Sequence, residues 1–195
     1  PERILGRITV DIVTIIAPPL AGKGTQSKKL AEKTGWVHIS TGDLLRDRMK
    51  GNSKVAKEIR AAMKNGAFVS PDLVDKLLKE RLAKDDCKAG VILDGYPRTL
   101  AQTVNLKSIC AEANRNFLGA VFIDVPYAEL FNRLAQRGRA DDKPELLKNR
   151  LKDYENHTKW VAELYQRQGT LHNIDGTLPL DEVADKIYTN RAQAA

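Results

Sequence analysis

The sequence predicts an α/β fold, in which helices cover both faces of a five-stranded parallel sheet and residues 1–195 form a single domain. Three observations support this prediction. Short, continuous apolar segments alternate along the chain with segments of helical periodicity. The apolar segments lack an alternating polar face, which is typical of strands buried on both sides. A chain of 195 residues is also long enough for one sizeable core.

The five expected strands lie near residues 9–17, 36–40, 90–94, 119–125 and 171–175. The first contains Ile12, Val13, Ile15 and Ile16, and the third and fourth are similarly apolar. Helical patterns fill the intervals, at roughly 24–34, 42–50, 53–65, 71–84, 100–112, 127–137, 144–168 and 180–192. Strands that alternate with helices in this way favour a parallel sheet.

The start of the fourth predicted helix is the most clearly marked. Ser70 is a capping residue, Pro71 suits the first helical position, and Asp72 places a negative charge in the first turn. The apolar stripe that follows indicates a core-facing side. Thr99 is similarly expected to cap the helix at 100–112.

Two segments between predicted elements do not read as simple connections. Residues 41–69 form a helical excursion between the second and third strands, which we expect to be a lobe for a second substrate. Residues 138–143 form a short polar break between two helices, and we expect a small lid there.

Composition narrows the class of protein. No apolar run reaches the ~18 residues of a membrane span, and no signal-peptide pattern is present, so we expect a cytoplasmic protein. Cys87 and Cys110 are isolated, which argues against zinc. We expect no metal or catalytic role for His38, His157 or His172, which are scattered.

The net charge of +7 is compatible with nucleic acid or with polyanionic small molecules. Arginines gather between Arg133 and Arg150 without the interleaved aromatic residues that stack bases. This pattern favours phosphates held in a pocket over a nucleic-acid strand.

A phosphate-binding loop is the strongest local signal. Residues 17–25 read Ala-Pro-Pro-Leu-Ala-Gly-Lys-Gly-Thr, between the first strand and the first helix. Backbone N–H groups and the helix N-terminus favour an anion in such a loop. Lys23 would add a positive charge at the β- and γ-phosphates of a nucleoside triphosphate.

The loop departs from the usual pattern at two positions. Ala17 stands where the pattern opens with glycine, and Leu20 stands where nucleotide kinases normally carry another glycine. If Leu20 adopts a positive φ, the strain is about 1–2 kcal/mol. The loop could adapt, could bind ATP weakly, or could belong to a non-catalytic nucleotide sensor; a turn that binds no ligand is the alternative for the loop taken alone.

Polar residues follow the second and third strands, at the edge where ligands of open parallel sheets bind. Thr41 and Arg46 come after the second strand, although a helix cap and a solvated arginine would explain them equally well. Asp94 ends the third strand, where it could orient Mg²⁺ through water. The following Gly95-Tyr96-Pro97 turn would direct Arg98 into the cleft.

A group of arginines follows the fourth strand. Arg133 and Arg137 share a helix face, Arg139 lies in the polar break, and Arg150 lies on the next helix. Like charges on one face repel each other unless they are solvated or a polyphosphate lies between them. A solvated basic helix is the alternative to a polyphosphate site.

Together these segments resemble the adenylate kinases with a short lid, over residues 9–190. The matching segments are Gly22 to Gln26, Ser40 to Arg46, Asp94 to Thr99 with Gln102, Gly138 to Asp142, and Ile174 to Thr177. The resemblance implies a P-loop nucleoside monophosphate kinase fold with a helical monophosphate-binding lobe. It also implies reversible phosphoryl transfer from Mg-ATP to AMP, giving two ADP.

The resemblance also implies roles for individual residues. It assigns catalysis to Lys23, Arg98, Arg137, Arg139 and Arg150. It assigns ATP binding to Leu20, Ala21, Gly22, Lys23, Gly24, Thr25, Arg133, Arg137 and Leu178. It assigns AMP binding to Thr41, Arg46, Ala67, Phe68, Val69, Gly95, Tyr96, Pro97, Arg98, Gln102, Arg139 and Arg150.

AMP is favoured as the acceptor because relatives that prefer pyrimidine monophosphates tend to carry Ala in place of Thr41 and lack the glutamine at Gln102. The resemblance further implies Mg²⁺ without zinc, a monomer, and small nucleotides (ATP, AMP and ADP) as partners in place of nucleic acid or membrane. A non-catalytic or ATP-binding-impaired homologue remains the alternative because of Ala17 and Leu20.

Overall fold

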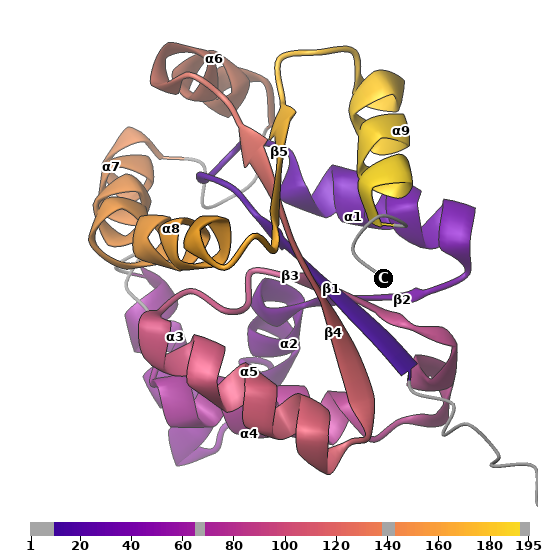
Figure 1. Ribbon diagram of the computed structural model, residues 1–195. Helices are drawn as coiled ribbons and strands as arrows, with labels where there is room; N and C mark the ends of the chain where they lie inside the picture. Colours follow the sequence, from indigo (N-terminus) through magenta and orange to yellow (C-terminus); the bar gives the residue numbers. More distant parts are fainter. Residues whose placement is uncertain (1–9, 65–68, 138–142, 192–195) are drawn as a thin grey trace, which may run out of the picture.

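The computed structural model describes residues 10–64, 69–137 and 143–191. This part of the chain forms one five-stranded sheet in the order β2-β3-β1-β4-β5 (Figure 1). Every pair of neighbouring strands is parallel, as the sequence predicts. The strands are β1 (Val10–Ile16), β2 (Val37–Ser40), β3 (Val91–Asp94), β4 (Arg115–Asp124) and β5 (Leu171–Asp175).

The helices fall close to the predicted ranges. They are α1 (Lys23–Thr34), α2 (Thr41–Arg48), α3 (Lys54–Lys64), α4 (Pro71–Leu82), α5 (Leu100–Glu112), α6 (Tyr127–Arg137), α7 (Pro144–Asp153), α8 (Lys159–Arg167) and α9 (Leu180–Arg191). A 3₁₀-helix at Asp85–Ala89 precedes β3.

Helices cover both faces of the sheet. On one face α1 packs against α9, and on the other α5 and α8 lie against β4 (Figure 1). Alternate residues of β1 serve the two sides: Val13 joins the cluster that contains Leu30 of α1, whereas Ile12 joins the cluster that contains Leu106 of α5. All of these side chains are buried, so the sheet is the middle layer of the core.

The predicted helix at 144–168 is divided. A π-helical turn at Tyr154–Thr158 joins α7 to α8, and such turns are common at functional sites. β4 begins at Arg115, four residues before the predicted 119, and its register with β1 shifts between Ile12 and Val13. The first residues of β4 are polar, so the apolar pattern in the sequence did not predict the start of the strand. In the structure the Arg115 guanidinium donates to the carbonyl oxygens of Leu82 and Cys87.

The predicted helix starts are largely confirmed. Thr99 caps α5, because its hydroxyl accepts a hydrogen bond from the Gln102 amide at 3.2 Å. Ser70 stands at the N-cap of α4, but its backbone carbonyl, not its side chain, accepts from the helix.

The predicted lobe, residues 41–69, contains α2 and α3, and four of its last five residues (65–68) lie outside the described residues. Of the predicted lid, residues 138–143, only Lys143 is described. Among the helices that the structure describes, none combines the length and the apolar composition needed to cross a membrane.

Candidate functional site

The strands end at one edge of the sheet because all five run in the same direction. Asp94, the last residue of β3, pairs in register with Ser40 of β2 and with Ile15 of β1. The loop after β1 and the starts of α2 and α5 therefore meet near Asp94. This arrangement brings the phosphate-loop segment and the two polar turns together. It follows the rule that ligands of open parallel sheets bind at the carboxyl ends of the strands, which we call the strand-end rule.

The loop after β1 has the backbone of an anion-binding turn. Gly22 precedes α1 with a φ of 91°, and the Ala21 amide donates to the Pro18 carbonyl at 3.3 Å. Leu20 has a φ of 67°, so the positive φ considered from the sequence is present. The first amides of α1 have no acceptors within their own helix, which makes this N-terminus favourable for a phosphate.

Lys23 is the cation of this loop. Its Nζ donates to the carbonyl oxygens of Ala17 at 3.0 Å and Pro18 at 3.3 Å. The ammonium group therefore folds back over the loop, and its charge contributes to lowering the pKa of Asp94.

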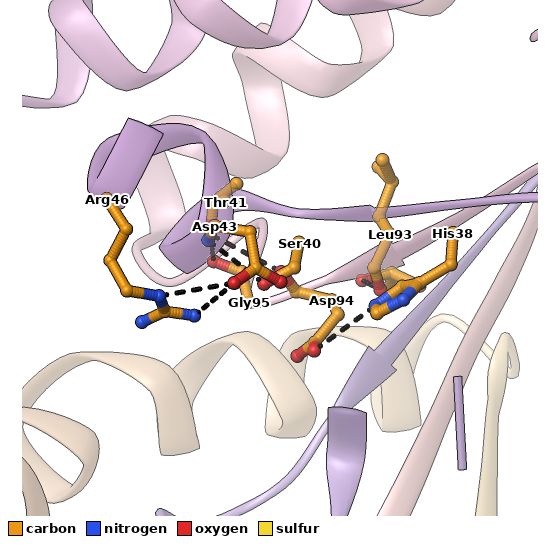
Figure 2. A network of polar contacts seen from close by, with 9 residues as sticks. His38, Ser40, Thr41, Asp43, Arg46, Leu93, Asp94 and Gly95 are labelled. Carbon is orange, nitrogen blue, oxygen red and sulfur yellow. Dashed lines mark hydrogen bonds and ion pairs between the residues drawn. The ribbon is translucent and has the colours of Figure 1, made fainter. Parts of the chain in front are cut away.

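Asp94 faces the loop. A Cβ added to Gly24 would lie 3.4 Å from its Oδ2 atom, and the same oxygen lies 3.4 Å from Nε2 of His38 (Figure 2). Burial by itself would raise the pKa of this carboxyl. The hydrogen bond with His38 and the positive charges of Lys23 and Arg98 outweigh it and hold the pKa below its usual range. Asp94 is therefore ionised at neutral pH.

His38, for which the sequence predicts no metal or catalytic role, lies beside Asp94. It lies two residues before Ser40, and its pairing with Asp94 depends on β2 lying beside β3. The sequence shows a histidine two residues before Ser40. Its proximity to Asp94 could be inferred only with the knowledge that β2 lies next to β3.

Thr41 is the first residue of α2, and Arg46 lies in its last turn (Figure 2). The Thr41 hydroxyl donates to the Gly95 carbonyl at 2.9 Å, which ties α2 to the turn after β3. Arg46 makes a 2.5 Å ion pair with Asp43, a residue absent from the sequence prediction. Burial raises the pKa of Asp43, but the Arg46 hydrogen bond and charge give a net lowering.

Arg98 follows the turn after β3. Its Nε donates to the Gly95 carbonyl at 2.8 Å. Burial lowers the pKa of Arg98 below its usual value, and the nearby charges of Arg150 and Arg46 act in the same direction, against Asp94 and Asp153. Arg150 and Arg46 are therefore each close enough to Arg98 to repel it, as expected around a bound anion.

The backbone of Arg98 is fixed on both sides. Its amide donates to Oε1 of Gln102 at 2.8 Å, and its carbonyl accepts from the Thr158 hydroxyl at 3.1 Å. Thr158 belongs to the π-helical turn, so this turn helps to position Arg98. The Gln102 side chain, predicted to read a base, is 4% exposed.

The other residues predicted to bind the monophosphate are either buried or lie outside the described residues. Tyr96 is 1% exposed and its hydroxyl donates to Asp75 at 2.7 Å, so its ring belongs to the core. Val69 and Pro97 are also buried. Ala67, Phe68 and Arg139 lie outside the described residues, as does the side chain of Arg137, which ends α6.

A second part of the site is a cavity of about 250 Å³ beside the start of α1. Five residues predicted for the triphosphate line it: Ala21, Gly22, Thr25, Arg133 and Leu178. Arg133 donates to the Gly176 carbonyl at 2.9 Å and pairs with Glu129 at 3.0 Å. The loop after β5 is thereby held against α6.

Within residues 10–64, 69–137 and 143–191, no group of three or more His, Cys, Asp or Glu side chains could by itself hold a metal ion. Mg²⁺ does not need such a group, because it commonly takes one or two carboxylates and completes its shell with water and phosphate oxygens. The ionised carboxylate of Asp94, facing the loop, fits an ion bound in this way.

Comparison with known proteins agrees with this geometry. The family model described as "Adenylate kinase" matches residues 15–170. The adenylate kinase of Stenotrophomonas maltophilia is 40% identical over 179 residues, which are 90% of this chain and 96% of the relative. Those of Thermus thermophilus and Thermotoga neapolitana are 38% and 36% identical, each over 90% of this chain and 94% of the relative.

Proposed function

The chain belongs to the adenylate kinase family, a family of nucleoside monophosphate kinases, and on that premise we propose that it catalyses Mg-ATP + AMP ⇌ 2 ADP. The observation that carries the proposal is the convergence of the phosphate loop, Asp94 and Arg98 at one edge of the sheet. Lys23 and Arg98 both lie close enough to Asp94 to influence its pKa.

ATP is the nucleotide that we assign to the phosphate loop. Its phosphates would lie against the amides at the start of α1 and meet Lys23. Its adenine would enter the cavity of about 250 Å³ lined by Arg133 and Leu178. This cavity adjoins Gly22 and Thr25, so one extended nucleotide can occupy both places.

AMP is the nucleotide that we assign to the α2 side. Arg46 and Arg98 would hold its phosphate, and the repulsion between these guanidinium groups would be relieved by the anion. Thr41 and Gln102, with the backbone near Val69 and Gly95, would surround its adenine. Because the Tyr96 ring is buried against Asp75, Tyr96 would contribute through its backbone.

The chemical step requires alignment and charge more than covalent participation by the protein. An oxygen of the AMP phosphate would attack the γ-phosphorus of ATP as the bond to the β–γ bridging oxygen breaks, and ADP would leave. The attacking oxygen is already anionic, so no general base is required. Lys23, Arg98, Arg137, Arg139 and Arg150 would stabilise the charge of the transferring group.

Mg²⁺, when bound, supplies positive charge at the β- and γ-phosphate oxygens. Asp94 would hold the ion through water. Its lowered pKa keeps it ionised for this task. Closure of the predicted lobe and lid would exclude the water that otherwise hydrolyses ATP. We further propose a cytoplasmic monomer that acts on free nucleotides.

The positive φ of Leu20 favours a second candidate, a nucleotide-binding homologue with impaired ATP binding or no catalysis. A coupled assay with ATP, AMP and Mg²⁺ separates the two. Turnover supports the kinase. Tight one-to-one binding of a linked two-adenosine polyphosphate without turnover supports the non-catalytic homologue, and the absence of both contradicts the proposed pair of nucleotide sites.

A further inference from the structure

A larger cavity, of about 380 Å³, lies outside the nucleotide site. It opens to solvent and is lined by residues of β4, β5, α6, α8 and the π-helical turn, on the α8 face of the sheet. Figure 1 shows α6 and α8 on the same side of β5. Its volume falls within the ~300–1,000 Å³ range of small-molecule sites.

The wall of this cavity is aromatic and apolar. Phe122 of β4, Tyr127 of α6 and Tyr154 of the π-helical turn contribute rings, and Ala162 and Leu171 contribute aliphatic surface. Apolar walls with a few placed polar groups are typical of ligand sites.

The charge of the cavity is opposite to that of the protein. Three carboxylates line it, from Asp124, Glu155 and Glu163, against one ammonium group, from Lys159. The lining thus carries a formal charge of −2, whereas the whole chain carries +7. Lys159 pairs with Glu155 at 3.4 Å, and Arg167 lies 4.0 Å from Glu163 with its side chain 80% exposed. Asp124 is therefore the carboxylate of this lining that a bound cation would meet first, and Glu163 could exchange its exposed partner for the ligand. Nucleotide phosphates would be repelled here.

Tyr154 places a hydroxyl group at the cavity. Its side chain is 7% exposed and lines the cavity, and its hydroxyl makes no hydrogen bond to another residue of the described chain. Burial and the nearby charge of Asp124 raise its pKa to about 12, so the hydroxyl stays protonated and close to a carboxylate. The hydroxyl oxygen is not fully buried, so water or a ligand in the cavity can serve as its partner.

We propose that this cavity is an accessory binding site for a small organic ammonium ion with an apolar body. The body would lie among Phe122, Tyr127 and Tyr154, where a ring or a branched alkyl group fits and where the aromatic faces attract a cation. The ammonium group would meet Asp124 and Glu163, with the Tyr154 hydroxyl as a further acceptor.

The site is placed to influence the nucleotide site without overlapping it. Pro18 lines the cavity, and its carbonyl accepts the hydrogen bond from Lys23. Tyr154 directly follows α7, the helix that carries Arg150. A ligand here therefore contacts the neighbours of two cationic residues of the proposed reaction.

The test compares three probes of similar size and different charge: 2-phenylethylammonium, neutral 2-phenylethanol and anionic 3-phenylpropionate. Each is titrated into the ¹⁵N-labelled full chain and followed by NMR. We expect the ammonium probe to give saturable shifts that include the side-chain amides of Gln166 and Asn173, which line the cavity. The alcohol should bind more weakly and the carboxylate weakest. A saturating linked two-adenosine polyphosphate should not displace the ammonium probe.

Charge-removing variants identify the carboxylates. Asp124→Asn and Glu163→Gln should each weaken binding of the ammonium probe about two- to fivefold, the effect of a partly exposed ion pair. They should leave binding of the alcohol unchanged. The matched control is Glu112→Gln on α5, an acid paired with Lys79 outside the cavity, which should leave all three probes unchanged.

Three results would overturn the inference. One is the absence of saturable shifts with the ammonium probe in a folded protein. Another is equal binding of the ammonium and carboxylate probes. The third is displacement of the ammonium probe by the linked polyphosphate, which would place it in the nucleotide site.

Discussion

Three cationic side chains at the carboxyl ends of the strands each make a hydrogen bond or an ion pair with an oxygen atom of the protein. Lys23 donates to two carbonyls of its own loop, Arg98 donates to Gly95, and Arg46 pairs with Asp43. A phosphate that binds these cations must compete with those oxygens. The strength of nucleotide binding therefore depends on the residues that supply them.

Asp43 is the competitor that mutation can remove most cleanly. Asp43→Asn should tighten AMP binding about two- to fivefold, because Arg46 loses an exposed ion pair and the phosphate meets less negative charge. Calorimetric titration with AMP measures this change. Asp47→Asn is the matched control, since Asp47 lies on the same helix and pairs with Lys50. Weaker AMP binding in Asp43→Asn would show that Asp43 positions Arg46.

Arg98 should be far more sensitive. Arg98→Ala should lower kcat/KM about 10³–10⁵-fold, the range for a transfer-site arginine, while the fold is retained. The coupled assay gives the rate and circular dichroism checks the fold. Arg167→Ala removes an arginine that is 80% exposed on α8 and should leave the rate unchanged. Near-normal turnover in Arg98→Ala would remove Arg98 from the reaction.

Leu20 allows the strain in the phosphate loop to be measured. Leu20→Ala and Leu20→Gly both remove the side chain, but only glycine accommodates a φ of 67° without cost. The glycine variant should therefore be more stable than the alanine variant by about 1 kcal/mol, the reverse of their usual order. Urea unfolding of both variants decides the question. An alanine variant of equal or greater stability would show that the backbone at Leu20 is unstrained.

At the scale of the elements, capping chemistry and apolar patterning located the helices, because Thr99 and Pro71 mark helix starts that depend on local sequence alone. The start of β4 and the π-helical turn could not be predicted in the same way. Arg115 begins β4 by donating to carbonyls 28 and 33 residues earlier in the chain. The turn at Tyr154–Thr158 lies within one helical pattern and is distinguished only by its contact with Arg98.

The candidate site was predictable to the same extent. Asp94, Arg98 and the phosphate loop follow apolar strands, so the strand-end rule places them together. His38 and Asp43 depend on which strand neighbours β3 and on how Arg46 turns, neither of which is encoded locally.

α3 is the second helix of the predicted lobe. Its buried residues are Ala56 and Ile59, and it packs mainly on α2. Ile59→Ala should cost about 2–5 kcal/mol through the cavity it leaves, because Ile59 is fully buried. Hydrogen exchange should show that the loss of amide protection is concentrated in α3. The coupled assay should show a raised KM for AMP.

Val104→Ala on α5 is the control, since Val104 is 63% exposed and its truncation should change stability by less than ~0.5 kcal/mol. Uniform loss of protection across the sheet in Ile59→Ala would show that α3 unfolds only with the whole molecule.

At the scale of the whole molecule, buried phenols set the alkaline limit of stability. Burial raises the pKa values of Tyr96, Tyr154 and Tyr165, that of Tyr154 to about 12. Because these folded-state pKa values lie above the unfolded value of about 10, the unfolded chain releases these protons first as pH rises. The stability that Tyr154 contributes is complete below about pH 10 and is lost as pH rises through about 12, and that of Tyr96 and Tyr165 is lost at still higher pH.

Tyr154→Phe removes one of these ionisations. The variant should retain about 2 kcal/mol more of its neutral-pH stability than the parent protein does at about pH 11.5. Urea unfolding at about pH 8 and about pH 11.5 measures the difference. Tyr188→Phe, at a ring that is 40% exposed, is the control. A Tyr154→Phe variant with the same pH dependence as the parent would place the alkaline transition in other groups.

The common direction of the strands also has a practical consequence for handling the protein. β1 runs seven residues, roughly 23 Å, from Val10 to the start of the phosphate loop. A dye or a surface linker attached ahead of Val10 joins the fold at the rim opposite to the one where the nucleotides would enter. Immobilised by that end, the protein would present the carboxyl ends of its strands to the surrounding solution.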